Sequence, residues 1–202
     1  MKILLAPDSF KGTARATQVA NLLEQAIREK CPQAQIRKIP IADGGEGTVD
    51  ALLAATGGRK KSIWVTGPLG QPVQAHYGIL PDETVVVELA EAAGLELVPD
   101  DLRNPLNTTS RGLGELLAHV KNQDPKKLLV GIGGSATNDG GMGMLAALGA
   151  KFYDQQGKLL LGYGRDLERV ETVDLSGCTP LPNGQVICDV NNPLLGKTGA
   201  TA

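Results

Sequence analysis

The residues of this chain best suited to chemistry lie in glycine-rich segments that also carry acidic, amide or hydroxyl side chains. The richest segment follows an apolar stretch that ends at Val130, and it contains Gly131, Gly133 and Gly134. Glycines let a backbone turn sharply and expose its N–H groups, and a helix starting near Gly140 would direct its positive end to the same point. This pattern predicts an anion or nucleotide site. Its expected phosphate-binding residues are Gly133, Gly134, Ser135, Thr137 and Asn138, with the carboxylate of Asp139 beside them.

Two more segments of this kind follow the first two expected strands. Asp8 and Lys11 lie after the first strand, and Asp43 and Glu46 flank two glycines after the second. Ligands of open α/β sheets gather at the carboxyl ends of strands. Asp8 could be a general base or a Mg²⁺ ligand and Lys11 could neutralise a phosphate, although a capped turn with a solvated lysine explains this segment taken alone. The spacing of Asp43 and Glu46 leaves room for a hydrated cation, and we predict them as metal ligands.

Two polar segments later in the chain complete the candidate site. Ser110 and Arg111 begin an expected helix, where Arg111 could bind a substrate carboxylate through paired donors, while helix capping explains the hydroxyl groups equally well. Asp189 and Asn191 follow an apolar strand near residues 186–188, where an Asx turn is the simpler explanation. We predict these four residues as substrate-binding.

The elements expected to position these residues alternate between strands and helices. The first part of the chain reads strand, helix, strand, helix, which predicts a parallel α/β layer. Short strands joined by Gly- and Pro-rich turns then favour antiparallel pairing, and they are followed by a helix at 110–121 and a strand at 127–130. We therefore expect an α/β fold with a partial Rossmann-like domain over residues 1–62 and a mixed α/β domain over residues 63–202.

Composition excludes several classes of protein. The chain has 202 residues, of which 42% are hydrophobic and 21% charged, and its net charge of −2 gives no footprint for nucleic acid or an anionic membrane. No apolar run approaches the ~20 residues of a membrane span, and the N-terminal run reaches Pro7 too soon for a signal peptide, so a cytoplasmic location is expected. Three cysteines without a C-x-x-C pair indicate neither a disulfide framework nor a zinc site.

Two patterns resemble nucleotide-binding motifs only weakly. Gly196–Thr198 is similar to the end of a phosphate loop, but Asn191 stands where that loop needs a glycine. Residues 131–136 fit a dinucleotide-binding fingerprint, with Asp154 at about the required ~20-residue distance. Asp139 would repel a pyrophosphate at that helix start unless a metal ion lay between them. A nicotinamide-dependent oxidoreductase remains an alternative.

Six segments, in order, make the chain resemble the bacterial glycerate kinases of the class I type; they are residues 6–12, 42–48, 66–70, 108–112, 131–141 and 188–195. The resemblance implies two α/β domains with the active site in the cleft between them. It also implies ATP-dependent phosphorylation of D-glycerate, giving 2-phosphoglycerate in most members, with Mg²⁺ as helper. Family members are nearly twice as long, so the resemblance implies that their C-terminal portion completes the first domain.

The resemblance and the residues together suggest a mechanism based on positioning and charge neutralisation. In this hypothesis Asp8 accepts the proton of the glycerate hydroxyl, Lys11 and the glycine-rich turn hold phosphates, and Arg111 holds the glycerate carboxylate. Magnesium would be held by Asp43, Glu46 or Asp139, and the division of labour between the acids stays open. A non-catalytic anion- or nucleotide-binding fragment is the other alternative. Expected partners are D-glycerate and either a complementary C-terminal polypeptide or a second copy, with no nucleic acid and no membrane.

Overall fold

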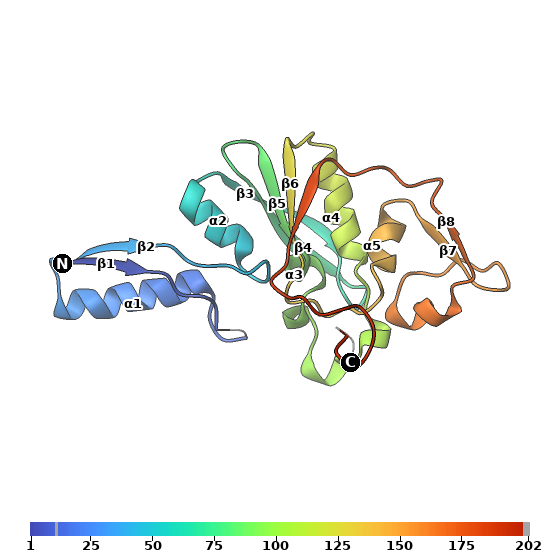
Figure 1. Ribbon diagram of the computed structural model, residues 1–202, viewed down its shortest axis with the longest axis horizontal. Coiled ribbons are helices and arrows are strands. Elements are labelled where there is room, and N and C mark those ends of the chain that lie inside the picture. Colours follow the sequence, from blue (N-terminus) through green and yellow to red (C-terminus); the bar gives the residue numbers. More distant parts are fainter. Residues whose placement is uncertain (11, 200–202) are drawn as a thin grey trace.

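The computed structural model describes residues 1–10 and 12–199 (Figure 1). Its strands are β1 (Lys2–Leu5), β2 (Gln35–Lys38), β3 (Arg59–Thr66), β4 (Pro72–Ile79), β5 (Thr84–Glu88), β6 (Lys127–Gly131), β7 (Lys151–Tyr153), β8 (Thr172–Asp174) and β9 (Gly184–Ile187). Its α-helices are α1 (Ala16–Lys30), α2 (Thr48–Thr56), α3 (Leu89–Ala93), α4 (Arg111–Lys121) and α5 (Met142–Ala147). Short 3-10 helices are η1 (Leu95–Leu97), η2 (Asp100–Leu102), η3 (Pro105–Asn107) and η4 (Gly164–Arg169).

The first two strands and α1 form a small unit that projects from one end of the molecule (Figure 1). β1 and β2 pair in parallel, as the sequence predicts, with Ile3 opposite Ile36. α1 buries Ala16 and Ala20, but Leu22 on the same helix is 63% exposed. The apolar pattern of α1 is therefore only partly used in packing.

The larger part of the chain is built on a five-stranded sheet in the order β3-β4-β5-β6-β9. β3, β4 and β5 are antiparallel neighbours, as expected from their short turns, whereas β5, β6 and β9 run parallel. Every residue of β5 is buried. Val85 and Val87 join the apolar core that α4 contributes to with Leu116 and Leu117, while α2 contacts β3, β4 and β5. Because side chains alternate along a strand, a strand covered on both faces reads as a continuous apolar run.

Just before the domain boundary expected near residue 62, α2 packs on the large sheet. This helix contacts β3, β4 and β5, and it also contacts α1. β3 itself begins at Arg59 and pairs with β4 along its whole length. Residues 48–62 therefore pack with the second region, because Val49 and Leu53 approach Gly78 on β4, where no side chain separates them from the sheet.

A second, smaller core lies around β7 and β8, which form an antiparallel pair. Met142, Ala150, Phe152 and Leu160 pack together there. Within the described part of the chain, no helix combines the length and the hydropathy needed to cross a membrane.

Candidate functional site

The candidate site lies where the parallel strands of the large sheet end. β5 ends at Glu88, β6 at Gly131 and β9 at Ile187, so the loops that follow these strands leave the same edge of the sheet. Residues 43–47, here called the acidic loop, reach this edge from the N-terminal unit. The backbone N–H of Gly133 donates to the carbonyl oxygen of Gly44 at 3.0 Å, which joins the acidic loop to the loop after β6.

Glycines are required here because two stretches of backbone lie against each other. A Cβ atom on Gly133 would stand 2.7 Å from the Cα atom of Gly45, and one on Gly131 would stand 2.4 Å from the carbonyl oxygen of Gly44. Real Cβ atoms do not approach so closely, so a side chain at either position would push the loops apart. The N–H of Gly133, predicted as a phosphate donor, is engaged within the protein in this arrangement.

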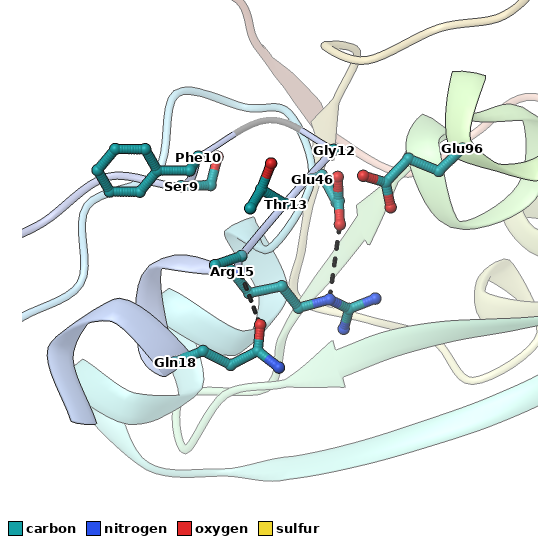
Figure 2. A pocket seen from close by; sticks show the side chains of 9 residues that line it. Ser9, Phe10, Gly12, Thr13, Arg15, Gln18, Glu46 and Glu96 are labelled. Atoms are coloured by element: carbon teal, nitrogen blue, oxygen red, sulfur yellow. Dashed lines mark hydrogen bonds and ion pairs between the residues drawn. The ribbon is translucent and has the colours of Figure 1, made fainter. Parts of the chain in front are cut away.

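A pocket of about 180 Å³ opens beside the acidic loop (Figure 2). Glu46 lines it, together with Arg15 at the start of α1 and Glu96 in η1. The Nε atom of Arg15 lies 3.5 Å from Oε1 of Glu46, and Figure 2 shows the carboxylates of Glu46 and Glu96 facing one another. Burial, followed by the hydrogen bond and charge of Glu96, raises the pKa of Glu46 above its ordinary value, while Arg15 opposes this effect.

Sequence reasoning identified only Glu46 among these three charged residues. Arg15 and Glu96 belong to no glycine-rich motif, and they are 31 and 50 positions from Glu46 in the sequence. They combine a guanidinium with two carboxylates in one small pocket. Such a set can bind a small ligand that carries both an anionic group and hydroxyl donors.

Asp139 is placed differently from the ligand-facing position that its motif suggests. Its carboxylate is 2% exposed and accepts hydrogen bonds from both the N–H and the hydroxyl of Ser110, at 2.7 and 2.8 Å. It also accepts the N–H groups of Gly141 at 2.9 Å and Gly143 at 3.2 Å. Asp139 therefore joins the start of α4 to the start of α5.

The first turn of α5 is satisfied by protein groups. Besides the two N–H groups bound by Asp139, the N–H of Met144 donates to the hydroxyl of Ser110 at 3.0 Å. The helix expected to point its N–H groups at a phosphate instead points three of them at side chains of this chain. The phosphate-binding role of the helix start stays a prediction, and these three N–H groups are engaged through the long-range contact between α4 and α5.

The hydroxyl segment before α4 is also buried. Thr108 and Thr109 are each 1% exposed, and their hydroxyls donate to the carbonyl oxygens of Ala136 and Gly162, at 2.9 and 2.6 Å. The contact of Thr108 joins the loop after β6 to the start of α4, and the contact of Thr109 joins the segment before η4 to the same point. Thr108 and Thr109 therefore hold backbone segments in place and do not face solvent.

Arg111 forms an ion pair within its own helix. Its Nε atom lies 3.1 Å from Oε1 of Glu115, and Glu115 also accepts the N–H and hydroxyl of Thr66 at 2.7 and 2.9 Å. The guanidinium is thus held at the end of β3, at the same edge of the sheet as the other loops. Its proposed contact with a substrate carboxylate would have to be made from this position.

The remaining predicted residues lie in exposed loops. Asp8 accepts the N–H of Ser9 at 2.6 Å, and the hydroxyl of Ser135 lies 2.9 Å from that of Thr137. Asp189 and Asn191 are exposed in the segment after β9, as is Asn138 in the loop after β6. Lys11 lies outside the described residues. The acidic loop reaches the loop after β6 through its backbone: a Cβ atom on Gly134 would stand 4.0 Å from the backbone N of Glu46.

The donor set of the acidic loop can be compared with the needs of Mg²⁺. This ion is usually bound through one or two carboxylates, several waters and substrate phosphates. The described residues contain no group of three or more His, Cys, Asp or Glu side chains arranged around one point. Glu46 is half-buried and faces Glu96, and Asp43 receives the N–H of Gly45 at 2.9 Å. The described residues therefore offer single carboxylates at this place and no complete protein cage for a cation.

Fold and site together define an α/β protein whose candidate ligand site lies at the carboxyl ends of parallel strands. Comparison of the sequence with known families identifies it more closely. The pattern of the glycerate kinase family matches residues 3–202, and the chain belongs to that family. The resemblance carried by its six motifs is thereby confirmed.

Individual relatives agree with this assignment. The chain is 49% identical to a glycerate 2-kinase of Escherichia coli (strain K12) over 205 residues, covering 100% of this chain and 54% of that protein. It is also 49% identical to a glycerate kinase of Bacillus subtilis (strain 168), with the same coverage of 100% and 54%. A crystal structure of a protein assigned as glycerate kinase 2 from Salmonella typhimurium LT2 is 48% identical, with a TM-score of 0.80, covering 100% of this chain and 55% of that one. The chain therefore spans about half the length of the relatives it matches.

Proposed function

We propose that this chain takes part in the ATP-dependent phosphorylation of D-glycerate to 2-phosphoglycerate. The observation that carries the proposal is the contact between the acidic loop and the loop after β6, beside the pocket of Arg15, Glu46 and Glu96. Membership of the glycerate kinase family supports the substrate, and the name of the Escherichia coli relative supports transfer to the 2-hydroxyl.

Phosphoryl transfer depends on positioning and on charge neutralisation rather than on covalent help from the protein. The glycerate hydroxyl oxygen would attack the γ-phosphorus of ATP, ADP would leave, and the hydroxyl proton would pass to Asp8, which is exposed after β1. Lys11 and the loop after β6, including Ser135, would hold phosphate oxygens. Arg111 would orient the glycerate carboxylate from the end of β3.

Magnesium, when bound, would neutralise phosphate charge at the acidic loop. Glu46 and Asp43 are the carboxylates we propose for it. Asp139 is better suited to positioning, because four hydrogen bonds already use its buried carboxylate.

A complementary polypeptide is the proposed partner of the N-terminal unit. A two-stranded sheet is marginally stable by itself. β1 and α1 expose Leu4 (60%), Leu22 (63%) and Leu23 (42%), and Ile41 after β2 is 51% exposed. The relatives contain nearly as many residues again beyond the aligned part, and we propose that this portion completes a Rossmann-like layer on β1 and β2.

A non-catalytic anion- or nucleotide-binding role is the second candidate. The observation that favours it is the pocket lined by Arg15, whose guanidinium can bind an anionic group without a catalytic step. The oxidoreductase alternative has less support, because the N–H groups of Gly133 and Ala136 donate to Gly44 and Ala93 instead of facing a pyrophosphate.

The proposal is tested by measuring ADP release from the purified 202-residue chain with D-glycerate, ATP and Mg²⁺. A thermal melt on the same sample verifies folding. We expect glycerate-dependent turnover that falls by about 10²-fold or more in Asp8→Asn, since a lost general base has an effect of this size. A folded chain that binds ATP without turnover would support the non-catalytic role instead. Unaltered turnover in folded Asp8→Asn would remove that residue from the mechanism.

A further inference from the structure

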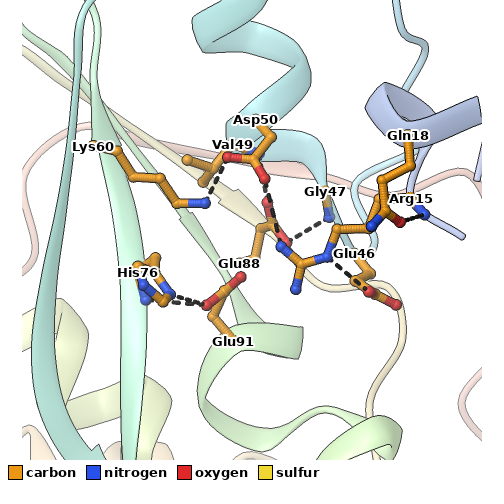
Figure 3. Close-up of polar contacts among 10 residues, drawn as sticks. All are labelled: Arg15, Gln18, Glu46, Gly47, Val49, Asp50, Lys60, His76, Glu88 and Glu91. Carbon is orange, nitrogen blue, oxygen red and sulfur yellow. Dashed lines mark hydrogen bonds and ion pairs between the residues drawn. The ribbon is translucent and has the colours of Figure 1, made fainter. Parts of the chain in front are cut away.

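Glu88 is a buried acid that the proposed chemistry does not use. It is the last residue of β5 and only 1% exposed. Its Oε2 atom accepts the N–H of Gly47 at 3.0 Å, and its Oε1 atom accepts the N–H of Val49 (Figure 3). The carboxylate therefore satisfies two of the N–H groups that the start of α2 leaves without a helical partner.

The charged residues around Glu88 are paired with one another. Figure 3 shows Arg15 beside Glu46 and Asp50, Lys60 beside Asp50, and His76 beside Glu91. Within this described group of residues, Glu88 is bound by backbone N–H groups, and the charges of Asp50 and Glu91 oppose its ionisation. A buried carboxylate is costly unless hydrogen bonds hold it, so its contacts to Gly47 and Val49 define the local backbone strongly.

The backbone that Glu88 holds is the end of the acidic loop. Gly47 has a φ of +88°, a conformation that side chains rarely adopt, and it directly follows Glu46. At the other end of the loop, the N–H of Gly133 holds the carbonyl oxygen of Gly44. Glu46 thus lies between two hydrogen-bonded positions, Gly44 and Gly47, and the second is held by the carboxylate of Glu88.

We propose that Glu88 is a positioning residue that holds the acidic loop at Gly47 and thereby directs Glu46 into the pocket shared with Arg15 and Glu96. This inference rests on the proposed function, because that function makes the pocket a ligand-binding site. It predicts that loss of the Glu88 carboxylate changes the environment of Glu46 more than it changes the core of the large sheet.

The test compares Glu88→Ala and Glu88→Gln with the wild-type 202-residue chain by NMR. Glu83→Gln is the matched control, because Glu83 is an exposed residue in the turn before β5 and pairs with Lys126. Amide hydrogen exchange is measured at Gly47 and Val49 and, as the core reference, at Leu116 and Leu117 of α4. Nuclear Overhauser contacts between the side chains of Glu46 and Arg15, which form an ion pair, report whether Glu46 stays in the pocket.

In Glu88→Ala we expect exchange at Gly47 and Val49 to rise by about 10-fold or more relative to α4, because two buried donors lose their acceptor. The contacts between Glu46 and Arg15 should weaken in the same variant. Glu88→Gln retains one acceptor oxygen and should give an intermediate result, which serves if the alanine variant does not fold. Glu83→Gln should leave both readouts unchanged.

Equal acceleration in α2 and α4, or unchanged contacts between Glu46 and Arg15 in both variants, would overturn the proposal, because Glu88 would then stabilise the fold alone. D-glycerate and Mg²⁺–ATP are added to each chain as probes. If the wild type binds neither probe, the proposed function fails, whereas the exchange and contact results still decide the role of Glu88.

Discussion

Replacing Asp139 with alanine is expected to lower the free energy of unfolding by about 4 kcal/mol, because it removes a buried carboxylate that accepts four hydrogen bonds. Two of its donors, the N–H groups of Gly141 and Gly143, belong to the start of α5, and the other two belong to Ser110 before α4. Without Asp139 these donors are buried with no acceptor. Urea denaturation at neutral pH measures the change.

The matched control is Asp82→Ala. The Asp82 side chain is exposed and accepts one N–H, that of Thr84 at 3.0 Å, so its loss should cost less than about 1 kcal/mol. Asp139→Asn keeps the volume and removes the charge, and we expect an intermediate loss. An Asp139→Asn variant with wild-type stability but greatly reduced turnover would contradict the positioning role and favour the base or metal role considered for this residue.

The stability of the chain is expected to fall as the pH rises from about 5 to about 8, because burial raises the pKa of Glu88 from 4.5 to about 7. Between these values the folded chain keeps the proton that the unfolded chain releases, so each increase in pH favours unfolding. The difference between the pKa of Glu88 in the folded and the unfolded chain corresponds to about 3 kcal/mol of the free energy of unfolding. This contribution is fully present below pH 4.5 and is lost once the pH exceeds 7.

Thermal or urea denaturation of wild type and Glu88→Gln across this pH range isolates the effect. The variant has no ionisable group at this position, so its stability should depend much less on pH. The raised pKa of Glu46 acts in the same direction, so part of the pH dependence stays in the variant. The acids whose pKa values are lowered, such as Asp154 and Asp174, contribute at lower pH. Parallel pH profiles for the two chains would refute the assignment to Glu88.

Elements with strong local patterns could be predicted from the sequence. The run of valines in β5 and the apolar spacing of α4 led to strands and helices close to those observed. The short α3, β7 and β8 were not predicted, because three to five residues carry too little periodicity to identify an element. The partner of α2 could not be predicted either, since the small residue that admits it, Gly78, lies in another element.

The sequence predicts which loops carry the candidate site, but it does not predict which residues of these loops contact one another. Glycine spacing identified the acidic loop and the loop after β6, yet the contact between Gly44 and Gly133 spans 89 positions and leaves no local signal. The polar motifs of Ser110 and Asp139 predict ligand binding, with helix capping open for Ser110; the hydrogen bonds that join the two residues to each other and to α5 are long-range and leave no local signal. Glu88 was overlooked because an acid at the end of an apolar strand carries no motif of its own.

The most direct test of this account is an NMR titration of the 202-residue chain with D-glycerate and Mg²⁺–ATP, followed through assigned backbone amides. We expect the largest shifts at residues 9–10 and 12–18, in the acidic loop at residues 43–47, and around Glu96, where the pocket lies. Shifts confined to the region of β7 and β8, or no shifts in a folded chain, would contradict the claim that this edge of the sheet binds glycerate and ATP.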